Sequence, residues 1–416
     1  MKKWIMACSV ICLAHTAVYS EGIEESDYLQ EKTSSFDIPS LEEQLELGRR
    51  VKIKGLGGEL SLEGEVRSEL QLTSERHGGL QQRGRKSEGY QAPFANNDIE
   101  ANLSLKYKNE DSWAQIKIKF DNDQGIGSGT TNKLAVSKAI FGTQWIESDS
   151  FSLATEVGRT SLGSYFDSKI QFGSRLDGVA VAMQSSLEKV GQLYCHLAPF
   201  VINENFNRYG GAAELGLVDM FDTGFFSKLS YVDWDLGGAS QTKVDRMVYG
   251  HKNLQMTVGH QSTLPWLKLP LKLYLSGLVN LKNSTDFDPV LARANKGAYV
   301  GCSLGLLGKP RSFALDVNYQ WVEARAVSEF DAACIGRGNI VKRGLYTSKL
   351  KGEGNALGVN EGIGSGNFQG FAVELIYQMT QNITCFQSFK RSSTLSSRVG
   401  PDMDYYQAEV EFIYAF

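Results

Sequence analysis

The last eleven residues of the chain, Tyr406-Gln407-Ala408-Glu409-Val410-Glu411-Phe412-Ile413-Tyr414-Ala415-Phe416, alternate in character with a period of two. Every even position is apolar or aromatic, whereas the odd positions include Gln407, Glu409 and Glu411. Successive side chains of a strand point to opposite faces. The stretch therefore predicts a strand with one apolar and one mostly polar face, a pattern that a soluble sandwich could also contain.

The same alternation recurs upstream. Leu60, Leu62 and Val66 share one face of their segment, opposite Glu63 and Glu65. Each run is about ten residues long, which is the length that a tilted strand needs to cross a bilayer. We count sixteen such segments: 60–72, 97–107, 112–121, 135–146, 150–159, 168–185, 190–201, 208–217, 223–234, 245–261, 269–282, 296–306, 311–322, 367–378, 382–390 and 405–416.

The connections between these segments also alternate. Those after even-numbered segments are mostly tight, as at 109–111, 147–149, 307–310 and 379–381. Those after odd-numbered segments are mostly longer, as at 73–96, 122–134, 283–295, 323–366 and 391–404. Short periplasmic turns and long extracellular loops are typical of outer-membrane barrels. The sequence predicts an all-β transmembrane antiparallel up-and-down β-barrel of about 16 strands, within a range of 14 to 18.

The first 58 residues differ from this pattern. Residues 1–20 combine Lys2 and Lys3 with an apolar run and the small residue Ser20, which predicts a signal peptide. Residues 21–58 are polar and are expected to form a periplasmic segment with one short helix after Ser40, before a barrel over 59–416. No later stretch is apolar enough for a helical span. Without residues 1–20 the chain carries 41 basic and 47 acidic residues, which excludes a strongly basic nucleic-acid footprint.

The polar faces of the predicted strands have to point into the barrel, because they cannot face lipid. A barrel of about 16 strands encloses an aqueous channel rather than a packed core. Charged inward residues are therefore the candidates for selectivity. From the strand pattern these are Glu63, Glu65, Arg67, Glu69, Lys106, Lys117, Lys119, Lys272 and Asp316. Acids on the first strand and lysines on the next two suggest a transverse field across the lumen.

No arrangement of residues predicts catalysis, a cofactor or a metal. The four histidines after residue 20 have no partner at a useful spacing, and no serine or HExxH motif is present. Cys195, Cys302, Cys334 and Cys385 lack metal-like spacing. The first, second and fourth fall in predicted strands, whereas Cys334 falls in the long loop and could cross-link to another envelope protein. We therefore expect no enzyme.

Two features resemble bacterial porins, and a third, the cysteines in predicted strands, departs from typical porins. The terminal Phe412, Tyr414 and Phe416 are similar to the signal by which the barrel-assembly machinery recognises outer-membrane barrels. The stretches 156–160 and 172–179 resemble the strands that flank the porin loop folded toward the pore. That resemblance implies constriction roles for Arg159, Arg175 and Asp177, a setting in outer-membrane lipid and a homotrimer. The cysteines in strands resemble those of chlamydia-like outer-membrane proteins.

These observations lead to two functional hypotheses. The first is an outer-membrane porin, a passive diffusion channel for small hydrophilic solutes or ions. The alternative is a structural or adhesive surface protein that acts through its long loops, above all 323–366. That loop carries six basic and five acidic residues together with Cys334.

Overall fold

The computed structural model describes residues 51–54, 57–77, 79–81, 95–123, 133–204, 207–237, 250–282, 292–328, 331–335, 366–399 and 402–416. The predicted signal peptide and the predicted short helix after Ser40 lie outside these residues. No helix in the described part of the chain is long and apolar enough to cross a membrane.

The described residues form eighteen strands and one short 3-10 helix, η1 (Leu162–Ser164). Sixteen of the strands are long, and β1 and β3 are short additions that pair with β2. The strands are β1 (Val51–Lys54), β2 (Glu59–His77), β3 (Leu80–Gln81), β4 (Ala95–Lys108), β5 (Ser112–Asp123), β6 (Lys133–Glu147), β7 (Phe151–Ser161), β8 (Arg175–Leu187), β9 (Gly191–Asn203), β10 (Arg208–Met220), β11 (Phe225–Gly237), β12 (Lys252–Leu264), β13 (Leu269–Asn280), β14 (Lys296–Gly305), β15 (Phe313–Val322), β16 (Phe368–Gln378), β17 (Ile383–Thr394) and β18 (Met403–Ala415).

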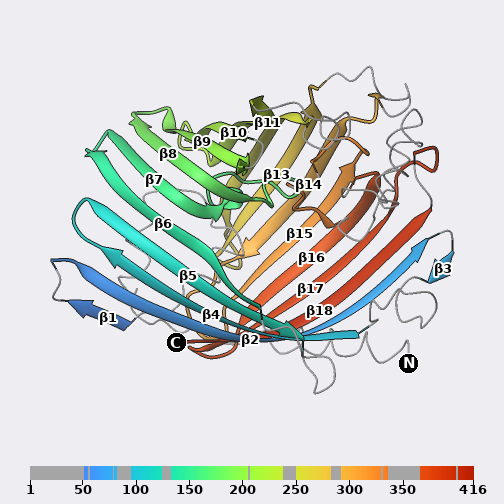
Figure 1. Ribbon diagram of the computed structural model, residues 1–416, viewed down its shortest axis with the longest axis horizontal. Helices are drawn as coiled ribbons and strands as arrows, with labels where there is room; N and C mark the ends of the chain where they lie inside the picture. The colour runs from blue at the N-terminus through green and yellow to red at the C-terminus, as the bar shows by residue number, and fades with distance from the viewer. Residues whose placement is uncertain are drawn as a thin grey trace.

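The long strands pair antiparallel in chain order, and the last pairs with the first (Figure 1). Strand β18 runs beside β2 from the pair Met403↔His77 to the pair Ala415↔Glu65. Beyond that pair, the backbones of Phe416 and Gly64 exchange two hydrogen bonds, of 2.9 and 3.0 Å. The predicted closed, antiparallel barrel of 16 strands is confirmed.

The wall has its apolar face outside. On β13, Leu273 and Leu275 are 46% and 54% exposed, while the alternating Lys272, Tyr274 and Ser276 are buried. A soluble protein does not expose long apolar strands all round its surface, whereas lipid requires them. The apolar side chains therefore face outward and the polar ones inward, which fits a membrane wall with a polar interior.

One predicted strand is wrong in its first part. The segment 168–185 was expected to be a single strand, but β8 begins at Arg175. The preceding residues alternate like a strand, yet Ile170 and Phe172 are buried inside the barrel. Apolar alternation therefore marks a chain that packs across the lumen here, rather than a strand of the wall.

Gly158 on β7 has a backbone conformation that only glycine adopts easily. Its φ is +130°, and an added Cβ would lie 2.1 Å from the carbonyl oxygen of Ala139 on β6. We expect Gly158→Ala to destabilise the barrel by about 1–3 kcal/mol through backbone strain alone. Urea unfolding of the refolded protein measures the loss. Gly277→Ala on β13, where the added Cβ meets nothing within 4 Å, is the control, and equal losses in both variants would contradict the explanation.

Candidate functional site

The connection between β7 and β8, which we call the inner segment (residues 161–174), folds into the barrel. It begins at Ser161, whose Oγ accepts a hydrogen bond from the N–H of Gly163 at 3.2 Å, and passes through η1. Its apolar side chains then join inward side chains of the wall. This cluster consists of Leu162, Phe166, Phe172, Leu176, Ala180, Ala198, Phe200, Ala212, Val232 and Trp234.

A second connection, described over residues 323–328 and 331–335 after β15, packs against the inner segment. The N–H of Gly173 donates to the carbonyl of Asp331 at 3.0 Å, and the N–H of Ala333 donates to that of Ile170 at 3.3 Å. Cys334 and Ile335 are buried in the same cluster as Ile170. The described start of the predicted surface loop 323–366 therefore lies inside the barrel, and residues 336–365 lie outside the described residues.

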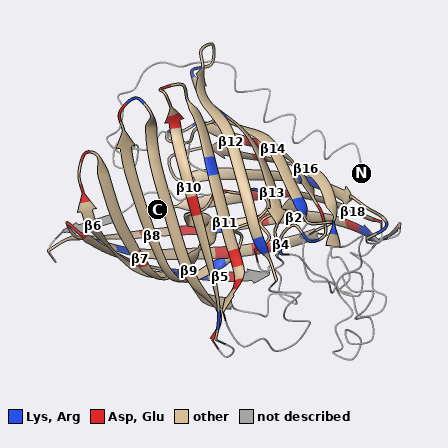
Figure 2. Ribbon diagram, turned by 90° about the horizontal axis from the view of Figure 1, so that it is seen from above, with Lys and Arg blue, Asp and Glu red and all other residues tan. Residues whose placement is uncertain are grey.

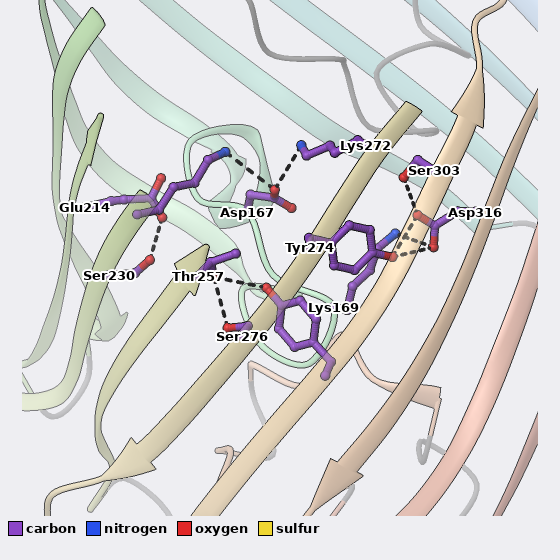
Figure 3. Close-up of polar contacts among 12 residues, drawn as sticks. Asp167, Lys169, Glu214, Ser230, Thr257, Lys272, Tyr274, Ser276, Ser303 and Asp316 are labelled. Carbon is purple, nitrogen blue, oxygen red and sulfur yellow. Dashed lines mark hydrogen bonds and ion pairs between the residues drawn. The ribbon is translucent and has the colours of Figure 1, made fainter. Parts of the chain in front are cut away.

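The inner segment is fixed to the far wall by one tight ion pair. Lys169 Nζ lies 3.0 Å from Asp316 Oδ1 on β15 (Figure 3). The same carboxylate accepts hydrogen bonds from Tyr274 at 2.9 and 3.0 Å and from Ser303 at 2.7 Å. Burial lowers the pKa of Lys169, but Asp316, together with Glu374 and Asp167, raises that pKa above its ordinary value overall. The lysine therefore stays charged.

Buried amides add a second attachment. Ser168 Oγ donates to Gln255 Oε1 at 2.8 Å, and Gln171 Nε2 donates to the same oxygen at 3.1 Å. Asn253 Nδ2 donates to Gln171 Oε1 at 3.1 Å. Because Gln171, Asn253 and Gln255 are all fully buried, these bonds fix the segment in one register on β12.

The opposite part of the lumen has a wet, charged wall formed by β18, β2, β4 and β5. Lys106 pairs with Glu63 at 3.0 Å, and Lys119 pairs with Glu100 at 2.7 Å. The side chains of these four residues are 15–34% exposed, whereas Asn253, Gln255 and Asp316 on the filled side are at 1% or less. Water therefore reaches these paired charges, but not the amides that fix the inner segment. In Figure 2, which draws Lys and Arg in blue and Asp and Glu in red, β9 carries no charged position.

On this charged wall, the opposite charges lie side by side rather than across the lumen. Arg67 lies 2.9 Å from Glu65 on its own strand and 3.6 Å from Glu411 on β18. Acids are in excess. By the register, the described inner face of the four strands carries the acids Glu59, Glu63, Glu65, Glu69, Glu75, Asp98, Glu100, Asp121, Glu409 and Glu411 against the bases Arg67, Lys106, Lys108, Lys117 and Lys119.

The twelve predicted lining residues separate into three groups. Seven lie together on the charged wall: Glu63, Glu65, Arg67, Glu69, Lys106, Lys117 and Lys119. Lys272 and Asp316 lie on the opposite wall and contact the inner segment. The three taken from the porin resemblance need correction. Arg159 and Asp177 form a two-bond pair of 2.6 and 2.8 Å, and with Arg175 they alternate with the buried Thr160 and Leu176. They therefore lie on the outer face.

The sequence pattern missed the residues that bring the two walls together. Asp167 lies just before the predicted segment 168–185 and Lys169 lies within it, but the chain crosses the lumen there, so the strand pattern did not identify either as a lining residue. Lys228 on β11 and Glu214 on β10 occupy alternate strand positions and could have been found by extending the inward pattern. Glu156 accepts hydrogen bonds from Trp113 Nε1 at 2.7 Å and from the Tyr165 hydroxyl, so it joins the wall to the inner segment.

The terminal aromatic residues lie where the pattern placed them. Phe412 and Tyr414 are about half exposed on the outer face of β18, and the Phe416 ring covers Gly64. A role in assembly stays a prediction. Cys195, Cys302 and Cys385 lie in strands, and none of the four described cysteines is joined to another. Within the described ranges, no group of three or more His, Cys, Asp or Glu side chains could hold a metal ion.

No protein-family model and no curated protein matches the sequence. Among solved structures, Pseudomonas putida OprB aligns with a TM-score of 0.50 at 9% identity, over 86% of this chain and 94% of that one. The fold is that of a porin. A triple mutant of the Rhodopseudomonas blastica porin also aligns, with a TM-score of 0.44 at 10% identity, over 86% of this chain and all of that one. At such identities the likeness concerns the fold alone.

Breaking the ion pair of the inner segment tests its anchoring. Lys169→Met leaves the Asp316 carboxylate, whose side chain is 2% exposed, without its cation, and we expect a loss of about 3 kcal/mol. Urea unfolding measures it. Lys189→Met, in the exposed turn between β8 and β9, should change stability by less than about 0.5 kcal/mol. A Lys169→Met barrel as stable as this control would mean that the pair does not hold the segment.

Asp331 lies in the second connection, where it contacts the inner segment. Its carboxyl oxygens are buried, and no described residue reaches them with a hydrogen bond of normal geometry. The nearest donors are the backbone N–H groups of Phe172 and Ser174 and the indole of Trp234. Burial raises the pKa of Asp331 to about 8, and these donors offset only part of the rise. The group is thus protonated in the folded protein at neutral pH.

This burial predicts a pH dependence of stability. An unfolded aspartate has a pKa of about 3.9. Between pH 4 and 8 the folded state therefore binds more protons than the unfolded state. The free energy of unfolding then falls as pH rises, by up to about 1.4 kcal/mol per pH unit. Asp331→Asn should remove this pH-dependent part of the stability. Urea unfolding at pH 5, 7 and 9 should show a flatter profile for Asp331→Asn than for the wild type or for Asp222→Asn in an exposed turn. Three parallel profiles would contradict the assignment.

Proposed function

We propose that the protein is an outer-membrane channel through which small hydrophilic solutes or ions diffuse passively between the charged wall and the inner segment. One observation carries the proposal. The paired charges of β2, β4 and β5 stay partly exposed to water, whereas the polar groups that the inner segment covers on β12 and β15 are fully buried. Burying charged groups costs free energy, so a barrel with a structural role alone would be expected to have a packed, apolar interior. An inner wall of solvated charges is not needed for such a role.

The outer face supports the membrane setting. Its apolar residues are exposed on strand after strand, and the closed sheet leaves no unpaired edge for lipid to meet. Export by residues 1–20, recognition of the terminal aromatic residues by the barrel-assembly machinery, and a homotrimer are parts of the same proposal. Chemical cross-linking of the protein in native membranes tests the trimer.

The adhesive alternative has less support. Its loop would have to present chain outside the barrel, whereas residues 323–328 and 331–335 pack inside it. Deleting residues 338–363 distinguishes the two functions, because a channel should still conduct without them and an adhesin should lose its surface partner.

The excess of acids on the charged wall predicts a preference for cations. Glu69 and Glu409 have no lysine or arginine within 4 Å in the described part of the chain, and each accepts a hydrogen bond from Gln71. In planar bilayers at pH 8, a potassium chloride gradient should give a reversal potential of cation-selective sign. Glu69→Gln with Glu409→Gln should lower the permeability ratio by on the order of twofold.

Glu110→Gln, in the exposed turn between β4 and β5, is the matched control and should leave the ratio unchanged. A refolded barrel that inserts without open current steps would disprove the channel. An open channel whose selectivity ignores both glutamates would place the selective region elsewhere.

A further inference from the structure

Two lysines of the inner wall converge on one carboxylate of the inner segment. Lys228 on β11 and Lys272 on β13 each place Nζ 3.6 Å from Oδ2 of Asp167. Figure 3 shows the contact between Lys272 and Asp167. Strand β12 lies between β11 and β13, so the two cations approach from non-adjacent strands. Ammonium groups that converge on one oxygen are the arrangement by which proteins hold carboxylates and phosphates.

The two sides of this contact differ in burial. The lysine side chains are 4% and 10% exposed, whereas that of Asp167 is 42% exposed. The Phe226 ring lies 5.5 Å from Lys228 Nζ and 5.3 Å from Lys272 Nζ, which holds both ammonium groups against an aromatic face. The cations are therefore fixed in the wall, and the anion is the partner that water reaches.

The neighbouring pair of the same segment shows the opposite arrangement. Between Lys169 and Asp316 the separation is 3.0 Å, and the carboxylate is the buried partner, held by further hydrogen bonds from strand residues. Charge-assisted hydrogen bonds are about 2.7–2.9 Å long, so the 3.6 Å contacts of Asp167 are long. Asp167 thus balances the two lysines without binding them tightly.

We propose that Lys228 and Lys272 form a binding site for a small oxyanion, a carboxylate or a phosphate, and that Asp167 occupies this site as an internal anion that the solute displaces. An anion free to approach both ammonium groups can form shorter contacts than a carboxylate tethered to the inner segment. Glu214 stays in place when Asp167 leaves, because Tyr194 and Ser230 hydroxyls donate to it at 2.7 and 2.5 Å. The wall then presents two cations with one remaining acid.

The site rests on the proposed function only for the route by which an anion reaches it from outside. With that route, the lumen carries an anion site on one wall and an excess of acids on the other. Passing anions would pause at the lysines while cations pass along the charged wall.

Titration calorimetry with inorganic phosphate on the full-length refolded protein, at constant ionic strength, tests the site without any need for conduction. We expect wild-type binding in the millimolar range, near −4 kcal/mol. Asp167→Asn removes the internal competitor and should bind about tenfold more tightly, a difference of 1.4 kcal/mol. Lys228→Gln and Lys272→Gln should each lose at least tenfold, and Lys106→Gln on the charged wall should bind like the wild type.

Binding seen only in Asp167→Asn would also support the site, because Asp167 would then fill it completely. No binding in either protein would overturn it, as would equal losses in Lys106→Gln and Lys272→Gln. If Asp167→Asn fails to fold, the comparison of Lys272→Gln with Lys106→Gln decides alone. Phosphate binding by a barrel that never conducts would refute the channel and keep the site. Current steps from a barrel that binds no phosphate would refute the site and keep the channel.

Discussion

The antiparallel pairing of β18 with β2 removes the two edges that a sixteen-stranded sheet would otherwise leave open. In hydrocarbon an unpaired backbone N–H or C=O costs several kcal/mol, so an open sheet could not stay in a membrane. Closure also decides which face is inside. Once the apolar face is turned toward lipid, every charged strand position has to share one enclosed space, and the interior chemistry follows from how that space is divided.

The division is unequal. Two connections, from β7 and from β15, bind each other and fill the side of the lumen that β8 to β16 enclose. The remaining charges line β18, β2, β4 and β5, where water reaches them. The barrel is thus neither an open pipe nor a packed core. The filling of the described lumen is held by apolar contacts and a few ion pairs that lie far from the charged wall.

The wall could be predicted from sequence because a strand between lipid and water has to alternate, and each of the sixteen expected segments overlaps one long strand. The same rule failed where chain packs across the lumen, since Ile170 and Phe172 alternate without joining the wall. The constriction roles of Arg159 and Asp177 were wrong for a different reason: they came from a short resemblance, which carries no information about the face of a strand. Asp167 meets lysines some 60 and 100 residues away in the chain, and only the closed fold brings them together.

The contacts that join the inner segment to residues 331–335 have a consequence for assembly. Neighbouring strands pair locally, and local pairing forms early, whereas the bond between Gly173 and Asp331 spans nearly 160 residues of chain and has to wait for most of the wall. Closure of the wall spans more chain still, since Met403 of β18 pairs with His77 of β2, more than 320 residues away. By chain separation alone, the two connections can dock before the last strand meets the first, so the barrel closes around a lumen that is already partly filled.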